Sequence, residues 1–151
     1  MIKTLFLMRH ADALPTERGK KDIDRKLSIE GIIEAKKNIK KIFTREEKLN
    51  YILVSTAKRT LMTQACFDQN IPIKVLPELY LAGVSTLLEM VNAIPPSVDT
   101  ACVIAHNPGL SQFVHYFTGQ MIEMPTASIV KIVFDYDDWN CVVAGRGVII
   151  I

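Results

Sequence analysis

Three short runs of apolar residues occur along the chain, and each stops abruptly at a polar or charged side chain. The runs cover residues 4–8, 51–54 and 100–105. They are short and continuous rather than alternating, which is typical of strands that are buried on both faces of a parallel sheet. Helical patterns lie between them, and strands that alternate with helices indicate an α/β fold.

The first half of the chain predicts two helices. A polar loop over residues 13–26 leads to Ser28, which is expected to cap the first helix. A second helix is expected to begin after Ser55 or Thr56, either of which could cap it, and to end near Gln69. The first helix carries an apolar stripe along one face, made of Ile29, Ile32, Ile33, Ala35, Ile39 and Ile42.

The second half predicts two more helices and an antiparallel addition to the sheet. A short strand over 71–76 precedes a helix capped by Ser85, and another helix covers 110–117. Strands at 127–134 and 141–144 form a terminal hairpin. We therefore predict a single domain over residues 1–151, a three-layer α/β/α sandwich around a mostly parallel sheet.

Composition excludes several classes of function. The chain is 49% apolar, enough for a sizeable core, and its net charge is only +2. There is no dense cluster of Lys and Arg with interleaved aromatic residues, so we expect no nucleic-acid partner. No apolar run could span a bilayer, and the first strand begins too early for a leader. A cytoplasmic protein without a membrane partner is the expectation.

The predicted strands end in chemically similar residues. Arg9 and His10 follow the first run, Ser55 and Arg59 follow the second, and His106 follows the third. Because the carboxyl ends of parallel strands lie along one edge of the sheet, these side chains are expected to converge. Guanidinium groups suit phosphoryl oxygens, so the sequence predicts a phosphoryl site. Metal binding by the two histidines is the weaker alternative, because the arginines would repel a cation.

These residues also carry a family resemblance. Leu7-Met8-Arg9-His10-Ala11 resembles the Arg-His-Gly signature of the histidine phosphatase (phosphoglycerate mutase-like) superfamily, with alanine in place of glycine. Residues 55–60 and 104–108 resemble its second-arginine and second-histidine motifs. Within the superfamily the chain is similar to the SixA-type phosphohistidine phosphatases. Residues 24–31 and Leu76-Pro77-Glu78-Leu79 resemble two further segments of that branch, although Lys26 replaces a proline.

The resemblance implies roles for individual residues. His10 would be the nucleophile that forms a phosphohistidine intermediate, with one ring nitrogen donating to a backbone carbonyl. Arg9, Arg59 and His106 would bind the phosphoryl oxygens, without a metal or other cofactor. Three further residues each have two interpretations. Arg25 would be a third phosphate-binding arginine or a surface residue, and Ser55 would be a pocket residue or, preferably, a helix cap. Glu78 would be the general acid or an exposed carboxylate.

Three functions remain open at this point. The first is a phosphohydrolase that acts on phosphohistidine in a protein, such as a phosphorelay or phosphotransfer component. The second is a phosphatase for a small phosphate ester. The third is a module that recognises a phosphorylated protein without turnover, which would have no use for the nucleophile at His10.

Overall fold

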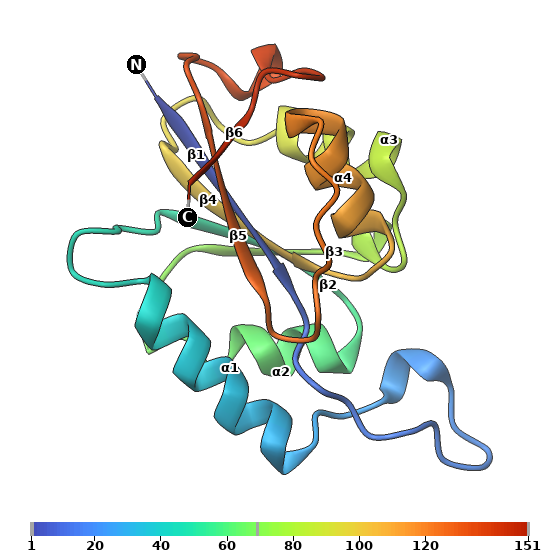
Figure 1. Ribbon diagram of the computed structural model, residues 1–151. Helices are drawn as coiled ribbons and strands as arrows, with labels where there is room; N and C mark the ends of the chain where they lie inside the picture. Colours follow the sequence, from blue (N-terminus) through green and yellow to red (C-terminus); the bar gives the residue numbers. More distant parts are fainter. Residues whose placement is uncertain (1, 69, 151) are drawn as a thin grey trace.

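A computed structural model describes residues 2–68 and 70–150 of the chain, and its core is one mixed sheet (Figure 1). The strands are β1 (Lys3–Arg9), β2 (Tyr51–Ser55), β3 (Ile73–Leu76), β4 (Thr100–Ala105), β5 (Ile129–Phe134) and β6 (Val148–Ile150). Their order is β3-β2-β4-β1-β5-β6. The first four strands of that order are parallel, and β5 is antiparallel to both of its neighbours. The mostly parallel sheet predicted from the sequence is confirmed.

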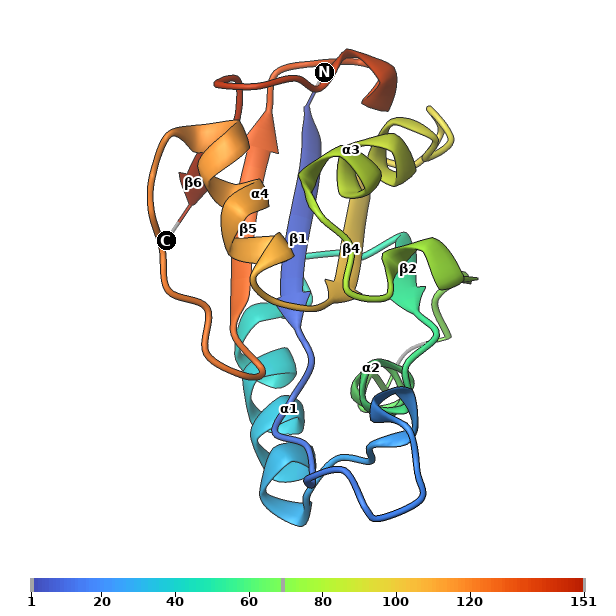
Figure 2. The ribbon, with the colours of Figure 1, turned by 90° about the vertical axis from the view of Figure 1, so that its right-hand side faces the viewer.

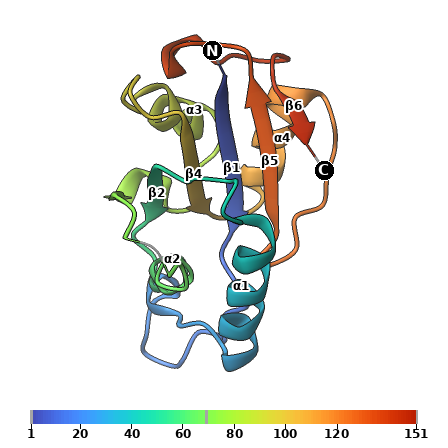
Figure 3. The same cartoon turned by 90° about the vertical axis from the view of Figure 1, so that its left-hand side faces the viewer.

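Helices cover both faces of the sheet. The helices are α1 (Ile29–Ile42), α2 (Lys58–Gln64), α3 (Val84–Asn92) and α4 (Gly109–Thr118). Helices α3 and α4 lie on the face seen in Figure 2, and α1 lies on the opposite face, seen in Figure 3. Because successive strand residues point to opposite faces, Leu5 and Leu7 join the core under α3 and α4, whereas Phe6 and Met8 join the core under α1 and α2. The three-layer sandwich is confirmed.

Helix α1 begins where the sequence predicts, but its buried face differs. Ser28 is the N-cap, and its side chain accepts a hydrogen bond from the backbone N–H of Gly31. The residues that face the core are Gly31, Ala35 and Ile39, spaced four apart along one stripe. The prediction that Ile29 and Ile33 belong to this stripe is wrong. They are 75% and 63% exposed, because they lie on the far side of the helix from Gly31.

The predicted caps of α2 and α3 are also corrected. Helix α2 begins at Lys58 with Ala57 at the N-cap and no side-chain cap. It ends at Gln64, and Gln69, the predicted end, lies outside the described residues. Helix α3 begins one residue before Ser85, and Gly83 occupies its N-cap position. In both helices the N-cap position is therefore occupied by a residue other than the polar one that the sequence pattern selects.

The antiparallel addition at the end of the chain is present, but its second strand lies further on than predicted. Strand β5 is paired by β6, whereas residues 139–141 form the short 3₁₀ helix η3 (Trp139–Cys141). Trp139 and Val142 are fully buried beneath α3 and α4. The Nε1–H of Trp139 donates to the carbonyl of Val98 at 2.7 Å. This segment therefore closes the end of the core instead of extending the sheet.

Two further 3₁₀ helices lie in the loops beside the strand ends. Helix η1 (Asp22–Asp24) belongs to the long connection between β1 and α1, and η2 (Pro77–Leu79) follows β3. The connection after β1 is closed by an isolated bridge between Ala13 and Leu27. In the described part of the chain, no helix has the length and apolar character needed to cross a membrane.

Candidate active site

The predicted site residues converge at the carboxyl ends of three neighbouring strands. Arg9 is the last residue of β1, Ser55 is the last of β2, and His106 directly follows β4. Arg59 comes from the first turn of α2. They surround a cavity of about 460 Å³, which is lined by Arg9, His10, Asp12, Ala13, Asp22, Arg25, Arg59, Leu81, His106, Asn107 and Thr126.

His10 is fixed in the tautomer that a nucleophile needs. Its Nδ1 lies 2.7 Å from the carbonyl oxygen of Ala11, which can only accept, so Nδ1 carries the proton. The lone pair is therefore on Nε2, and the predicted bond to a backbone carbonyl is confirmed. Burial, together with the charges of Arg59 and Arg9, lowers the pKa of His10 to about 4, against the opposing effect of the hydrogen bond to Ala11. The ring is neutral at physiological pH.

Ala11, which stands where the resembled motif has glycine, fits without strain. Its side chain is fully buried in the core under α1 and α2. Its backbone N–H donates to Oγ1 of Thr63 at 3.1 Å. Ala11 is not among the residues with positive φ, so the turn after β1 does not require glycine here.

His106 is held between Ser55 and Arg59. One Arg59 Nη atom lies 3.4 Å from Nδ1 of His106, and a guanidinium only donates. Nδ1 therefore accepts, and Nε2–H donates to Oγ of Ser55 at 2.8 Å. Burial and the charge of Arg59 lower the pKa of His106 to about 3. The preferred prediction for Ser55 is wrong, because its hydroxyl supports His106 and does not cap α2.

Arg9 and Arg59 retain unpartnered donors. Arg59 is 3% exposed, and Arg9 donates from one Nη to the carbonyl of Met124 at 3.0 Å. Among the described residues, the Nε atoms of both arginines are buried without a hydrogen-bond partner. Burial and the nearby Arg59 charge lower the pKa of Arg9. Two close guanidinium groups with unsatisfied donors make a site that is completed by an anion.

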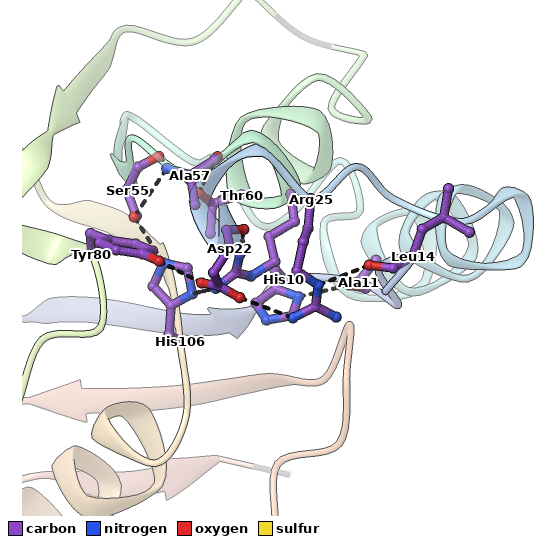
Figure 4. Close-up of polar contacts among 11 residues, drawn as sticks. His10, Ala11, Leu14, Asp22, Arg25, Ser55, Ala57, Thr60, Tyr80 and His106 are labelled. Atoms are coloured by element: carbon purple, nitrogen blue, oxygen red, sulfur yellow. Dashed lines mark hydrogen bonds and ion pairs between the residues drawn. The ribbon is translucent and has the colours of Figure 1, made fainter. Parts of the chain in front are cut away.

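Arg25 lies on the wall of the same cavity, where the resemblance places it. Its Nε donates to the carbonyl of Leu14 at 2.8 Å, and one Nη donates to Oδ1 of Asp22 at 3.3 Å. Figure 4 shows the Arg25 side chain beside His10, with dashed lines that join Arg25 to Asp22 on one side and to Leu14 on the other. The cavity therefore brings together Arg9, His10, Arg25, Arg59 and His106, with Ser55 behind His106.

Asp22 lies on the wall of the cavity and Tyr80 supports it from outside the lining, and neither residue was predicted from the sequence. The backbone carbonyl of Asp22 accepts from Arg59 at 2.9 Å, and its Oδ2 accepts from Arg59 at 3.1 Å and from the hydroxyl of Tyr80. The Tyr80 hydrogen bond and the neighbouring Arg59 lower the pKa of Asp22 to about 2. The ring of Tyr80 also packs edge-on against His106, at 5.4 Å between centroids. The only sequence signal for Asp22 is its spacing of three residues from Arg25.

Glu78 is not brought into the cavity. It is exposed in η2 and is absent from the lining residues. Leu79 turns inward and is fully buried, so the neighbouring Glu78 side chain is directed to solvent. The prediction that Glu78 acts within the pocket is therefore corrected. The carboxylates at the cavity are those of Asp12 and Asp22.

Residues suited to a metal ion do not gather at this site. Among residues 2–68 and 70–150, no group of three or more His, Cys, Asp or Glu side chains is arranged to hold one. The two histidines of the cavity lie beside arginines, with 5.5 Å between their ring centroids. The charge of the pocket favours an anion.

The fold that carries this cavity is similar to solved structures of SixA proteins. The structure superposes on the proposed phosphohistidine phosphatase SixA of Nakamurella multipartitia with a TM-score of 0.87, at 20% identity, covering 100% of this chain and 95% of that one. The corresponding SixA protein of Agrobacterium tumefaciens gives a TM-score of 0.81 at 25% identity over 87% of this chain and 92% of that one. The chain has the histidine phosphatase fold. Its resemblance to the SixA branch, predicted from the sequence, is confirmed.

Further comparisons agree at the level of the fold. The protein histidine phosphatase SixA in complex with tungstate gives a TM-score of 0.81 at 22% identity, over 98% of this chain and 94% of that one. No protein-family model matches the sequence. An uncharacterized protein of Mycobacterium leprae (strain TN) is 29% identical over 98 residues, which is 65% of this chain and 61% of the relative. The SixA structure of Agrobacterium tumefaciens, at 25% identity, supports a phosphatase activity, and the more distant neighbours support the fold.

Proposed function

We propose that the protein is a phosphohydrolase that removes a phosphoryl group from phosphohistidine in a protein, through a phosphohistidine intermediate on His10. The observation that carries this proposal is the His10 ring, neutral and locked with Nε2 unprotonated, in a cavity whose arginines retain free donors. Such a nucleophile would have no purpose in a site that only binds phosphate.

Binding and attack follow from the positions of the side chains. Arg9, Arg25 and Arg59 bind the phosphoryl oxygens, and the Nε2 lone pair of His10 attacks phosphorus in line with the leaving group. His106 uses its N–H on Ser55 and accepts from Arg59 through Nδ1, so it orients Arg59 rather than binding phosphate itself. The hydrogen bond from Nδ1 to the Ala11 carbonyl stabilises the positive charge that the ring gains. Water then hydrolyses the phosphohistidine and releases phosphate. The arginines offset charge that develops on the phosphoryl oxygens.

The surroundings of the cavity favour a protein substrate over a small phosphate ester. Leu81 lines the cavity and is 58% exposed, and Leu14, whose carbonyl holds Arg25, is also exposed. These two exposed apolar side chains are available to pack against a protein substrate. The SixA proteins among the structural neighbours support the same substrate class. A small phosphate ester remains the second candidate, because the cavity volume would accommodate one.

Trapping of the intermediate tests the proposal. The protein is incubated with a radiolabelled phosphohistidine protein and quenched in alkali, where phosphohistidine survives, and the label is located by peptide mapping. We expect label on His10 and none in His10→Ala. The matched control is His115→Ala, which removes an exposed histidine on α4 and should leave labelling intact. Label that persists in His10→Ala would refute the assignment.

Phosphate release separates the candidate functions. Release from the phosphohistidine protein with a much higher kcat/KM than from an aryl phosphate supports the proposed substrate. Comparable release from both indicates a general phosphatase. Binding without release from either indicates a recognition module.

A further inference from the structure

The cavity has a buried floor and a half-exposed mouth. His10, Arg59 and His106 form the floor, and none is more than 8% exposed. The Asp22 side chain is 44% exposed, whereas that of its partner Arg59 is 3% exposed, so Asp22 lies nearer to solvent. In an in-line attack by His10, the leaving group departs on the side opposite the nucleophile, which is the mouth. Asp22 therefore lies on the path of the leaving group.

Asp22 can stay in place while phosphate binds. It occupies both Nη atoms of Arg59, one through its backbone carbonyl and the other through Oδ2. The Asp22 carbonyl, Asp22 Oδ2 and His106 Nδ1 take three of the five N–H donors of Arg59, which leaves its Nε–H and one Nη N–H. The Nε–H of Arg9 is also without a partner among the described residues. A phosphoryl group can thus be held by the floor without displacing the carboxylate.

The carboxylate also has room for one more donor. Oδ2 accepts from Arg59 and from the Tyr80 hydroxyl, whereas Oδ1 accepts only from Arg25, at a long 3.3 Å. A carboxylate oxygen takes about two hydrogen bonds. The groups that face the Asp22 carboxylate are Arg59, Arg25 and Tyr80, and their hydrogen bonds favour its ionised form. His106 lies close by and is neutral.

We propose that Asp22 is a specificity-determining residue, whose ionised carboxylate selects phosphoimidazole substrates by accepting the N–H of the leaving ring. This inference rests on the proposed function of the same site. In phosphohistidine, the ring nitrogen that does not carry phosphorus can hold a proton, and Asp22 stabilises this phosphoimidazolium form through a charge-assisted hydrogen bond.

The reaction balances without a general acid. The Nε2 lone pair of His10 forms the new N–P bond, and the electron pair of the breaking P–N bond returns to the substrate nitrogen. The leaving imidazole departs neutral, with its proton still on the distal nitrogen beside Asp22. Because this reaction needs no general acid, it is consistent with the position of Glu78 outside the cavity.

An ester makes the opposite demand. Its leaving oxygen has no second protonation site and needs a proton or a strongly stabilised anion, and an ionised carboxylate supplies neither. An anionic substituent on the ester would also be repelled by Asp22. The same residue therefore favours phosphoramidates of imidazole and disfavours phosphate esters.

The test compares Asp22→Asn with Asp24→Asn, using N-phosphoimidazole and 4-nitrophenyl phosphate as substrates. Asp24 is exposed in the same 3₁₀ helix, so its substitution removes the same charge close by and serves as the control. We expect Asp22→Asn to lower kcat/KM for phosphoimidazole by about 10- to 100-fold, as for loss of a charge-assisted hydrogen bond. The value for the aryl phosphate should stay constant or rise, and vanadate should bind at least as tightly as to the wild type.

Three outcomes would overturn the inference. Equal losses for both substrates, or loss of vanadate binding, would mean that Asp22 only holds the arginines. An equal effect of Asp24→Asn would mean that general electrostatics suffice. These results leave the proposed function standing if His10 is still labelled, whereas a wild-type protein that releases phosphate from neither substrate would refute both.

Discussion

Nε2 of His106 and Oγ of Ser55 lie 2.8 Å apart, and this hydrogen bond joins the ends of the neighbouring strands β4 and β2. Because Nδ1 of His106 accepts from Arg59, the proton is on Nε2 and the histidine donates to the serine. The bond fixes which edge of the ring is presented to Arg59 and the cavity. Ser55 thus acts on the site through His106.

Ser55→Ala tests this relationship. Loss of one neutral hydrogen bond is worth about 1 kcal/mol, so we expect vanadate affinity to fall about fivefold. Isothermal titration calorimetry measures the change. Thr56→Ala, on the adjacent residue outside the cavity lining, is the control and should bind vanadate normally. Unchanged affinity in Ser55→Ala would show that the ring is held by its other contacts.

Arg59→Ala should have a larger effect. Arg59 is nearly buried, supplies a free Nε–H and holds the Asp22 loop. Loss of a hydrogen-bonded charge of this kind costs about 2–3 kcal/mol, so vanadate affinity should fall about 30- to 150-fold. Arg45→Ala removes an exposed arginine of the same charge and should bind as the wild type does. Equal affinities in the two variants would place Arg59 outside the phosphate site.

The two cavity histidines predict a pH dependence of stability. Their folded pKa values, about 4 for His10 and about 3 for His106, lie below the ordinary value of 6.5. As the pH falls below 6.5, both histidines become protonated in the unfolded chain but stay neutral in the folded protein. The free energy of unfolding therefore decreases. Each histidine contributes up to about 1.4 kcal/mol per pH unit.

Urea unfolding between about pH 7 and pH 5 measures this slope. His106→Asn should reduce the slope by about half, whereas His115→Gln, at an exposed position, should leave it unchanged. A slope that His106→Asn does not alter would contradict the pKa assigned to His106.

Gly109 marks a close approach between α4 and the loop that carries Tyr80 and Leu81. A Cβ atom at residue 109 would lie 2.0 Å from the carbonyl oxygen of Ala82. We expect Gly109→Ala to lower the free energy of unfolding by about 1–3 kcal/mol, because backbone must move. At Gly83 a Cβ meets open space, so Gly83→Ala should change stability by less than about 1 kcal/mol. Equal stability of both variants in urea unfolding would refute the close packing.

Strand β4 and the convergence of several cavity residues were predictable because they depend on local pattern. The continuous apolar run at 100–105 allows few alternatives to a buried strand, and the structure has β4 at those bounds. The parallel order then brings Arg9, Arg59 and His106 to one edge without further information. The Ser28 cap was readable for the same reason, since the residue and its partner lie three positions apart.

Other features depend on contacts between distant segments. Ser55 looks like a cap from its neighbours, but its partner His106 is 51 positions away. Asp22 and Tyr80 meet across 58 positions, between a polar loop and another loop, and no periodicity marks either. The second strand of the hairpin was misplaced because burial of Trp139 under α3 takes precedence over the local strand propensity of residues 141–144.

The two parts of the pocket belong to regions of different stability. Its floor is attached to β1 and β4, each of which has a paired strand on both sides in the middle of the sheet, and to the first turn of α2. Its mouth belongs to the connection between β1 and α1, which is closed by one bridge and a few side-chain hydrogen bonds. Amide hydrogen exchange should therefore be fast in residues 14–26 and slow in β1 and β4, because local opening releases the weakly held segment first. The pocket can open its mouth to a large molecule while His10 keeps its position.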